Sequence, residues 1–113
     1  MYIPPLKSQI TLAQDWSFTV YPEERNKSLY AAYNKKLEPV IGSYPIRYNI
    51  PSFIATLPAD TVLTIDRIFI RKGAEDFDSI TFIIESSPNP DFRPKKKVRF
   101  WVKLDDANNI LFN

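Results

Sequence analysis

The sequence has 113 residues, the length of one ordinary domain, and we expect a single globular domain over residues 1–113. Apolar residues make up 44% of the chain and charged residues 25%, a balance typical of a soluble globular protein. Because the chain contains neither cysteine nor histidine, disulfides, thiolate or imidazole metal sites and Ser-His or Cys-His catalytic pairs are excluded. We expect no cofactor and no metal.

Ten prolines but only two glycines, Gly42 and Gly73, punctuate the chain. Proline interrupts helices and central strands, so these counts predict short elements joined by defined loops. The net charge of +2 is too small to indicate a polyanionic partner by itself. No apolar run approaches the roughly 20 residues of a membrane helix, and the first ten residues lack the pattern of a signal peptide. We therefore expect a cytoplasmic protein without a membrane partner.

In the N-terminal half, residues 8–21 (SQITLAQDWSFTVY) predict a strand, a turn at positions 13–15 and a second strand, because apolar residues alternate on each side of that turn. The segment 22–37 predicts one short helix, which Asn26 would cap at its N-terminus. The apolar stripe of this helix would consist of Leu29, Tyr30, Tyr33 and Leu37. Residues 38–58 carry prolines at 39, 45, 51 and 58 between aromatic and branched residues, which favours an ordered, extended linker with one short strand.

The C-terminal half predicts an antiparallel meander of strands at 61–71, 79–85 and 95–104, followed by a turn at 105–109 and a terminal edge strand at 110–113. In the first strand the apolar parity changes after Ile65, which predicts a β-bulge at Asp66–Arg67; a strand buried on both faces is the alternative. The next two strands would share one core, made of Ile80, Phe82, Ile84, Val98, Phe100, Val102 and Leu104. The elements together predict a β-rich α+β fold: a curled antiparallel sheet of about five or six strands, or a small barrel, with one short helix.

Three segments resemble small uncharacterised proteins of bacteriophages and other mobile elements: LAQDWSFTVYPEERNKSL (12–29), LPADTVLTIDRIFIRKGAEDFDSITF (57–82) and RFWVKLDD (99–106). The similarity covers most of the chain. It implies a gene of phage, prophage or gene-cassette origin, and it transfers no activity to any residue.

Two strand segments, RIFIR and RFWVK, place cation, aromatic ring and cation at alternate positions. Their residues form the candidate binding face: Arg67, Phe69, Arg71, Arg99, Trp101 and Lys103. If both stripes lie on one sheet face, they suit single-stranded nucleic acid, whose bases stack on rings while cations follow the phosphates. A protein-binding patch is a second interpretation. In a third, the helix covers Trp101 and Phe69, with its stripe packed over both rings and the cations emerging at the edge.

Acidic clusters offer weaker hypotheses. Asp105 and Asp106 suit a hard cation, but aspartate is also an ordinary turn residue and the spacing matches no EF-hand. Glu23 and Glu24 suit acid–base chemistry, but sequence neighbours rarely converge, and carboxylates are ordinary in the first turn of a helix.

Four tyrosines form a second candidate surface, because tyrosine combines a large contact area with a hydroxyl and is enriched at interfaces. They fall on the predicted helix and the linker after it: Tyr30, Tyr33, Tyr44 and Tyr48. Partial burial at the rim of a small core is the structural alternative. We predict a non-enzymatic protein that acts through protein contacts, by self-association or with a host partner. A single-stranded nucleic-acid-binding module is the first alternative, and a small carboxylate-dependent enzyme the second.

Overall fold

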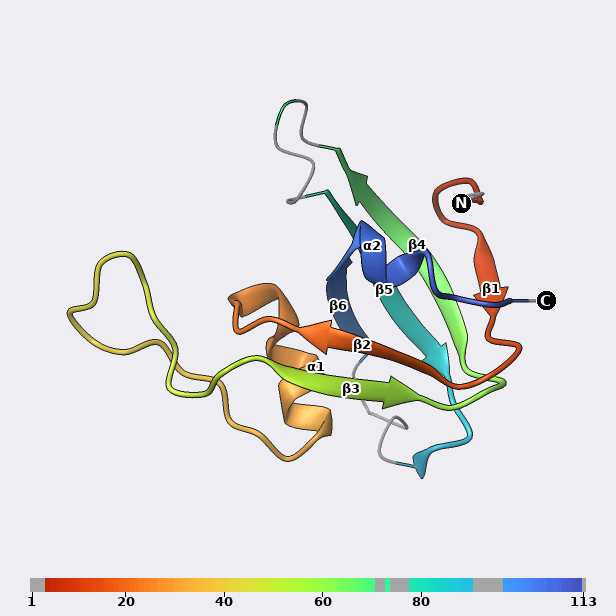
Figure 1. The fold of residues 1–113 in the computed structure, drawn as a ribbon. Helices are drawn as coiled ribbons and strands as arrows, with labels where there is room; N and C mark the ends of the chain where they lie inside the picture. The colour runs from red at the N-terminus through yellow and green to blue at the C-terminus, as the bar shows by residue number, and fades with distance from the viewer. Residues whose placement is uncertain (1–3, 71–72, 74–77, 91–96, 113) are drawn as a thin grey trace.

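The computed structural model describes residues 4–70, 73, 78–90 and 97–112. Within them, six strands and three short helical segments form two antiparallel sheets around one core (Figure 1). The strands are β1 (Gln9–Thr11), β2 (Trp16–Val20), β3 (Phe53–Leu57), β4 (Val62–Phe69), β5 (Ser79–Ser86) and β6 (Val98–Lys103). The helical segments are the 3-10 helix η1 (Glu24–Asn26), α1 (Lys27–Ala32) and α2 (Leu104–Ala107).

The larger sheet has the strand order β1-β4-β5-β6, and the smaller sheet pairs β2 with β3. Strands β4, β5 and β6 form the predicted antiparallel meander. The two N-terminal strands are present, but they do not belong to the same sheet: β1 pairs with β4, whereas β2 pairs with the short strand of the linker. The β-rich α+β class with a curled antiparallel sheet is confirmed, with its strands divided between two sheets.

An aromatic core joins the two sheets. The rings of Phe18 and Phe100 stack with centroids 5.2 Å apart, and Trp16 meets Phe82 edge to face at 5.7 Å. Aromatic pairs in these arrangements stabilise the fold beyond the effect of the apolar area that they bury. The predicted shared core of β5 and β6 is confirmed for the positions on the two strands, which are all buried. Leu104 differs, because it begins α2 and is only half-buried.

The predicted bulge in β4 is confirmed. Ile65 lies opposite Phe82 and Arg67 lies opposite Thr81, so Asp66 is the extra residue on this strand. Before the bulge the odd-numbered side chains of β4 are buried, and after it they are exposed. The bulge therefore turns one row of side chains from the core to the opposite face of the sheet.

Three local predictions are wrong. Asn26 makes no capping bond to α1; its side chain donates to the carbonyl of Tyr21 (3.0 Å) and accepts from the N–H of Trp101 (2.8 Å). The turn predicted after β6 begins instead as the helix α2. In the described residues, the predicted terminal strand is reduced to a single bridge between Leu12 and Phe112. No helix in this part of the chain is long and apolar enough to cross a membrane.

Candidate functional site

The strand register brings the two cation–aromatic stripes onto one face of the larger sheet. Arg67 and Trp101 both lie opposite Thr81 of β5, and Phe69 and Lys103 both lie opposite the residue two positions earlier. Directly opposed residues in a sheet point to the same face. The predicted binding face is thus continuous in register, with β5 between its two stripes. The predicted position Arg71 lies outside the described residues.

Trp101 is half-buried, and the chain segment that enters η1 covers its ring. Tyr21 stacks on Trp101 with centroids 5.5 Å apart and planes 11° apart. The guanidinium carbon of Arg25 lies 5.4 Å from the centroid of the same ring. The Lys103 ammonium lies 5.0 Å from the Tyr21 centroid and extends the cluster. Each of these rings and cations already has an aromatic partner inside the molecule.

The prediction that the helix stripe covers both Trp101 and Phe69 is wrong. Phe69 is 55% exposed, near the end of β4. The ring of Tyr30 in α1 packs elsewhere: it meets Phe53 of the smaller sheet edge to face, with centroids 4.9 Å apart. Whether the ring of Trp101 or of Phe69 is covered therefore depends on contacts between segments that are far apart in the sequence. The alternation of residues within one strand does not record such contacts.

Several cations near this face are paired with carboxylates. The Arg99 guanidinium lies 2.9 Å from Asp66, which also forms an ion pair with Lys7. The Lys7 ammonium and the Arg99 guanidinium hold the pKa of the Asp66 carboxyl below its ordinary value, against the opposing effect of burial. Lys97 lies 3.5 Å from Glu85. Such pairing reduces the positive potential that the face would offer to a phosphate backbone.

The carboxylates of the 22–25 segment do not converge. Glu23 accepts two hydrogen bonds from Arg25, at 2.6 and 2.8 Å, whereas Glu24 faces Lys27 at 3.8 Å. Partial burial acts to raise the pKa of the Glu23 carboxyl, but the Arg25 guanidinium outweighs burial and lowers it. A carboxylate held ionised by a bidentate arginine is suited to structure rather than to proton transfer at neutral pH.

The second acidic cluster, Asp105 and Asp106, lies in α2 and connects this helix to β2. Asp106 in α2 accepts a hydrogen bond from the backbone N–H of Thr19 (3.1 Å), and its carbonyl accepts from the Trp16 indole (3.1 Å). These bonds dock α2 against β2. In the described ranges, no three acidic side chains gather in a way that would hold a metal ion.

The four candidate tyrosines are separated by their burial. Tyr30 is fully buried, and its single hydroxyl proton is shared between the main-chain carbonyls of Val20 (3.3 Å) and Pro51 (3.1 Å). Tyr33 is half-buried and donates to the carbonyl of Thr56 (2.9 Å), and Tyr48 packs half-buried against the core. Tyr44 differs from all of these because its side chain is 97% exposed. One of the four is therefore placed for contact with a partner.

Tyr44 belongs to a group of exposed apolar side chains on the loop between α1 and β3. We call this group the apolar tip, and its exposed fractions are 46% for Val40, 99% for Ile41, 97% for Tyr44 and 66% for Ile46. Figure 1 shows the loop extending well beyond both sheets. Gly42, at φ +80°, occupies the left-handed conformation that the turn of this tip requires.

A hydrogen-bonded stalk supports the apolar tip. Pro39 and Tyr48 form a β-bridge, and the N–H of Val40 donates to the carbonyl of Arg47 (2.7 Å). Asn49 closes the base of the stalk, because its side chain accepts from the N–H of Glu38 (2.7 Å) and donates to the carbonyl of Lys36 (2.9 Å). At the tip, the hydroxyl of Ser43 accepts from the N–H of Arg47 (3.0 Å) and donates to the carbonyl of Val40 (2.9 Å). The loop is therefore an ordered element held by its own hydrogen bonds.

Sequence reasoning identified Tyr44 but missed Val40, Ile41 and Ile46. The signal is the stretch VIGSYPI (40–46), in which apolar residues flank a glycine and a proline in the linker between the predicted helix and the predicted strand at 61–71. Because apolar side chains in a linker usually pack against the nearest sheet, this stretch predicts an ordered linker and not an exposed apolar surface.

The chain matches no protein-family model, and neither the curated proteins nor the solved structures yield a match.

Proposed function

We propose that this protein works without catalysis, by binding another protein chain through the apolar tip. The observation that carries the proposal is the exposure of Ile41 and Tyr44, at 99% and 97%, on a hydrogen-bonded stalk. Burial of side chains of this size is worth roughly 1.5–3 kcal/mol each, so their exposure forfeits several kcal/mol. A monomer rarely keeps contiguous apolar surface uncovered unless a partner uses it.

The stalk makes the apolar tip suitable for binding. Because the backbone bonds of Val40 and Ser43 already hold the turn, association would order side chains but little main chain. A preorganised contact loses less conformational entropy when it binds. Tyrosine is also among the residues that most often dominate binding energy, because it buries a large ring with few rotatable bonds.

Two observations favour this proposal over binding of single-stranded nucleic acid. A base-stacking site needs an accessible ring, whereas the ring of Trp101 stacks on Tyr21 and lies under Arg25. A phosphate-binding surface needs available cations, whereas Arg99 is paired with Asp66. Nucleic-acid binding by the face that carries Arg67 and Phe69 is the alternative hypothesis.

Photo-crosslinking tests the proposal. A benzophenone amino acid would replace Tyr44 in the chain produced in its native cells, and the partner would be either a second copy or a host protein. We expect a discrete adduct after irradiation. The same amino acid at Ile70, which is 59% exposed but lies outside the loop, is the matched control and should give no such adduct. Absence of any adduct from position 44, or identical adducts from both positions, would contradict the proposal.

A further inference from the structure

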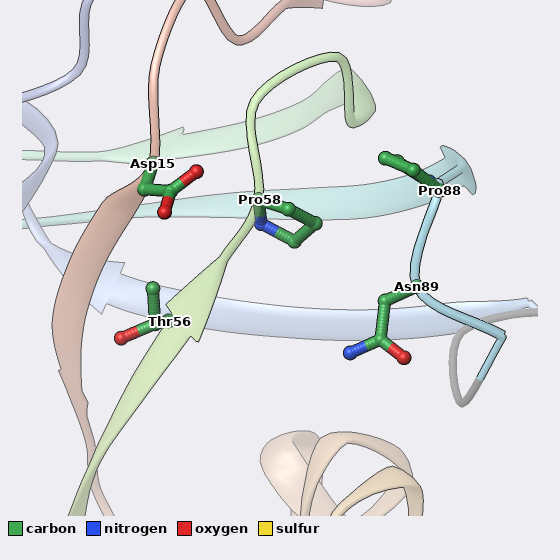
Figure 2. Close-up of a pocket in the computed structure, with 5 residues that line it drawn as sticks. All are labelled: Asp15, Thr56, Pro58, Pro88 and Asn89. Carbon is green, nitrogen blue, oxygen red and sulfur yellow. The ribbon is translucent and has the colours of Figure 1, made fainter.

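A shallow pocket lies at the other end of β3 from the apolar tip. It has a volume of about 310 Å³. Figure 2 shows the five side chains that surround it: Asp15, Thr56, Pro58, Pro88 and Asn89. They come from three segments, namely the turn before β2, the C-terminal end of β3 with the residue after it, and the residues that follow β5. The volume is at the lower limit of small-molecule sites and suits one large side chain with its neighbours.

The lining of this pocket fits a tyrosine. Pro58 and Pro88 offer two apolar rings, and Asp15 offers a carboxylate. One oxygen of Asp15 accepts from the backbone N–H of Ala59 (2.9 Å), which fixes the orientation of the carboxylate. An apolar wall beside one oriented acceptor suits an aromatic ring that carries a hydroxyl donor.

Resting on the proposed function, we propose that the partner of the apolar tip is a second copy of this chain, with Tyr44 of one copy seated in the Asp15–Pro58–Pro88 pocket of the next. Tyr44 is nearly fully exposed, and its hydroxyl would donate to the Asp15 carboxylate. A hydrogen bond to a charged acceptor is stronger than one between neutral groups.

The apolar tip and the pocket lie too far apart for contact within one chain, so Tyr44 can enter only the pocket of another copy. The loop enters β3 at Phe53, whereas the pocket includes Thr56 and the residue after the strand. Because a strand rises about 3.3 Å per residue and the loop extends away from the sheets, the tip and the pocket of one chain lie at opposite ends of the molecule (Figure 1). A knob at one end and a socket at the other make a heterologous contact, which builds a ring or an open filament rather than a twofold dimer.

Charge favours the same pairing. The exposed cation Arg47 follows the apolar tip along the loop. The exposed acid Asp15 lines the pocket. A second exposed acid, Asp60, follows Ala59, whose N–H donates to Asp15. Opposite charges at the rims of two apolar surfaces steer their encounter and fix their register.

Sedimentation velocity with two complementary variants tests this inference. Tyr44→Ser removes the knob, and Thr56→Trp fills the socket from an exposed strand position. We expect the wild-type chain to gain average mass as its concentration rises, and each variant alone to stay monomeric. An equal mixture of the two variants should form a dimer of twice the chain mass, because one intact knob then meets one intact socket. Ile70→Ser, the matched exposed control, should associate like the wild type.

Two outcomes would overturn the inference. One is association of Thr56→Trp at wild-type strength, which would indicate contact between two tips. The other is a wild-type chain that stays monomeric at all concentrations; if position 44 still crosslinks to a protein of another mass, the proposed function stands and the self-association fails. Asp15→Asn provides a second test of the socket, since it keeps the fold contact to Ala59 and should weaken association about tenfold. Circular dichroism confirms that each variant is folded.

Discussion

Ser28 and Arg99 are joined by two hydrogen bonds that close the outer edge of β6. The Ser28 hydroxyl donates to the carbonyl of Arg99 (2.9 Å) and accepts from its N–H (3.1 Å). Two positions further along β6, the N–H of Trp101 donates to the Asn26 side chain (2.8 Å). An open strand edge is a template for unwanted pairing with other chains, and here η1 and α1 occupy it with side chains.

Loss of the Ser28 hydroxyl should therefore destabilise the fold. Ser28→Ala leaves an N–H and a C=O of β6 without their partner, and we expect the free energy of unfolding in urea to fall by about 1–2 kcal/mol. Ser17→Ala is the matched control, because it removes an exposed side-chain bond to Thr56 and should cost less than about 0.5 kcal/mol. Equal losses for the two variants would contradict the edge-closing role.

Substitutions of Asn26 distinguish its predicted role as an N-cap from its observed role as a bridge between Tyr21 and Trp101. As an N-cap, Asn26 could be replaced by aspartate with little cost, because the two residues cap equally well. As the observed bridge, its amide must donate to Tyr21 and accept from Trp101 in a fully buried site, so Asn26→Asp puts an acceptor-only group there. We expect Asn26→Asp and Asn26→Ala each to lower the unfolding free energy by at least about 2 kcal/mol. An Asn26→Asp variant with the same unfolding free energy as the wild type would instead support the role of Asn26 as an N-cap.

Replacement of two phenylalanines of the larger sheet by alanine should lower the unfolding free energy by very different amounts. Phe100 is fully buried and stacks on Phe18, so Phe100→Ala should cost about 3–5 kcal/mol in chemical denaturation. Phe69 is 55% exposed, and Phe69→Ala should cost less than about 1 kcal/mol. A loss below 1 kcal/mol for Phe100→Ala would count against the aromatic core.

The ion pairs of Asp66 predict a pH dependence of stability. Because its pKa is lower in the folded than in the unfolded chain, the carboxylate stabilises the fold above its unfolded pKa, near 4, and this stabilisation is lost as the pH falls through the folded pKa. Asp66→Asn should lower the unfolding free energy by about 1 kcal/mol at neutral pH. The difference from the wild type should vanish in strong acid.

The Lys7→Gln background serves as the control for this titration, because the Lys7 ammonium is the main cause of the lowered pKa. In that background the effect of Asp66→Asn should shrink. A difference that is constant with pH, or that grows in acid, would contradict the assignment.

Period-two alternation predicted much of this molecule correctly. It placed Phe82 and Phe100 in one core, located the bulge at Asp66, and put Arg67 and Trp101 on a common face. These features depend on neighbours within a strand or on adjacent strands, which a local pattern records.

The covering of that face could not be predicted from the same pattern. Tyr21 lies 80 positions before Trp101, and the path that brings the two rings together depends on the Asn26 bridge. The apolar tip was missed for a related reason. Composition alone does not distinguish an apolar loop residue that packs on a sheet from one, such as Ile41, that a stalk holds in solvent.

The unfolding free energy of the triple variant Ile41→Ser, Tyr44→Ser, Ile46→Ser tests most directly whether the apolar tip exists for contact rather than for folding. These side chains are 99%, 97% and 66% exposed, so their removal takes almost nothing from the core. We predict an unfolding free energy within about 0.5 kcal/mol of the wild type, together with loss of association at the tip. A loss of about 2 kcal/mol or more would show that the tip packs within its own chain, and it would contradict its role as a binding surface.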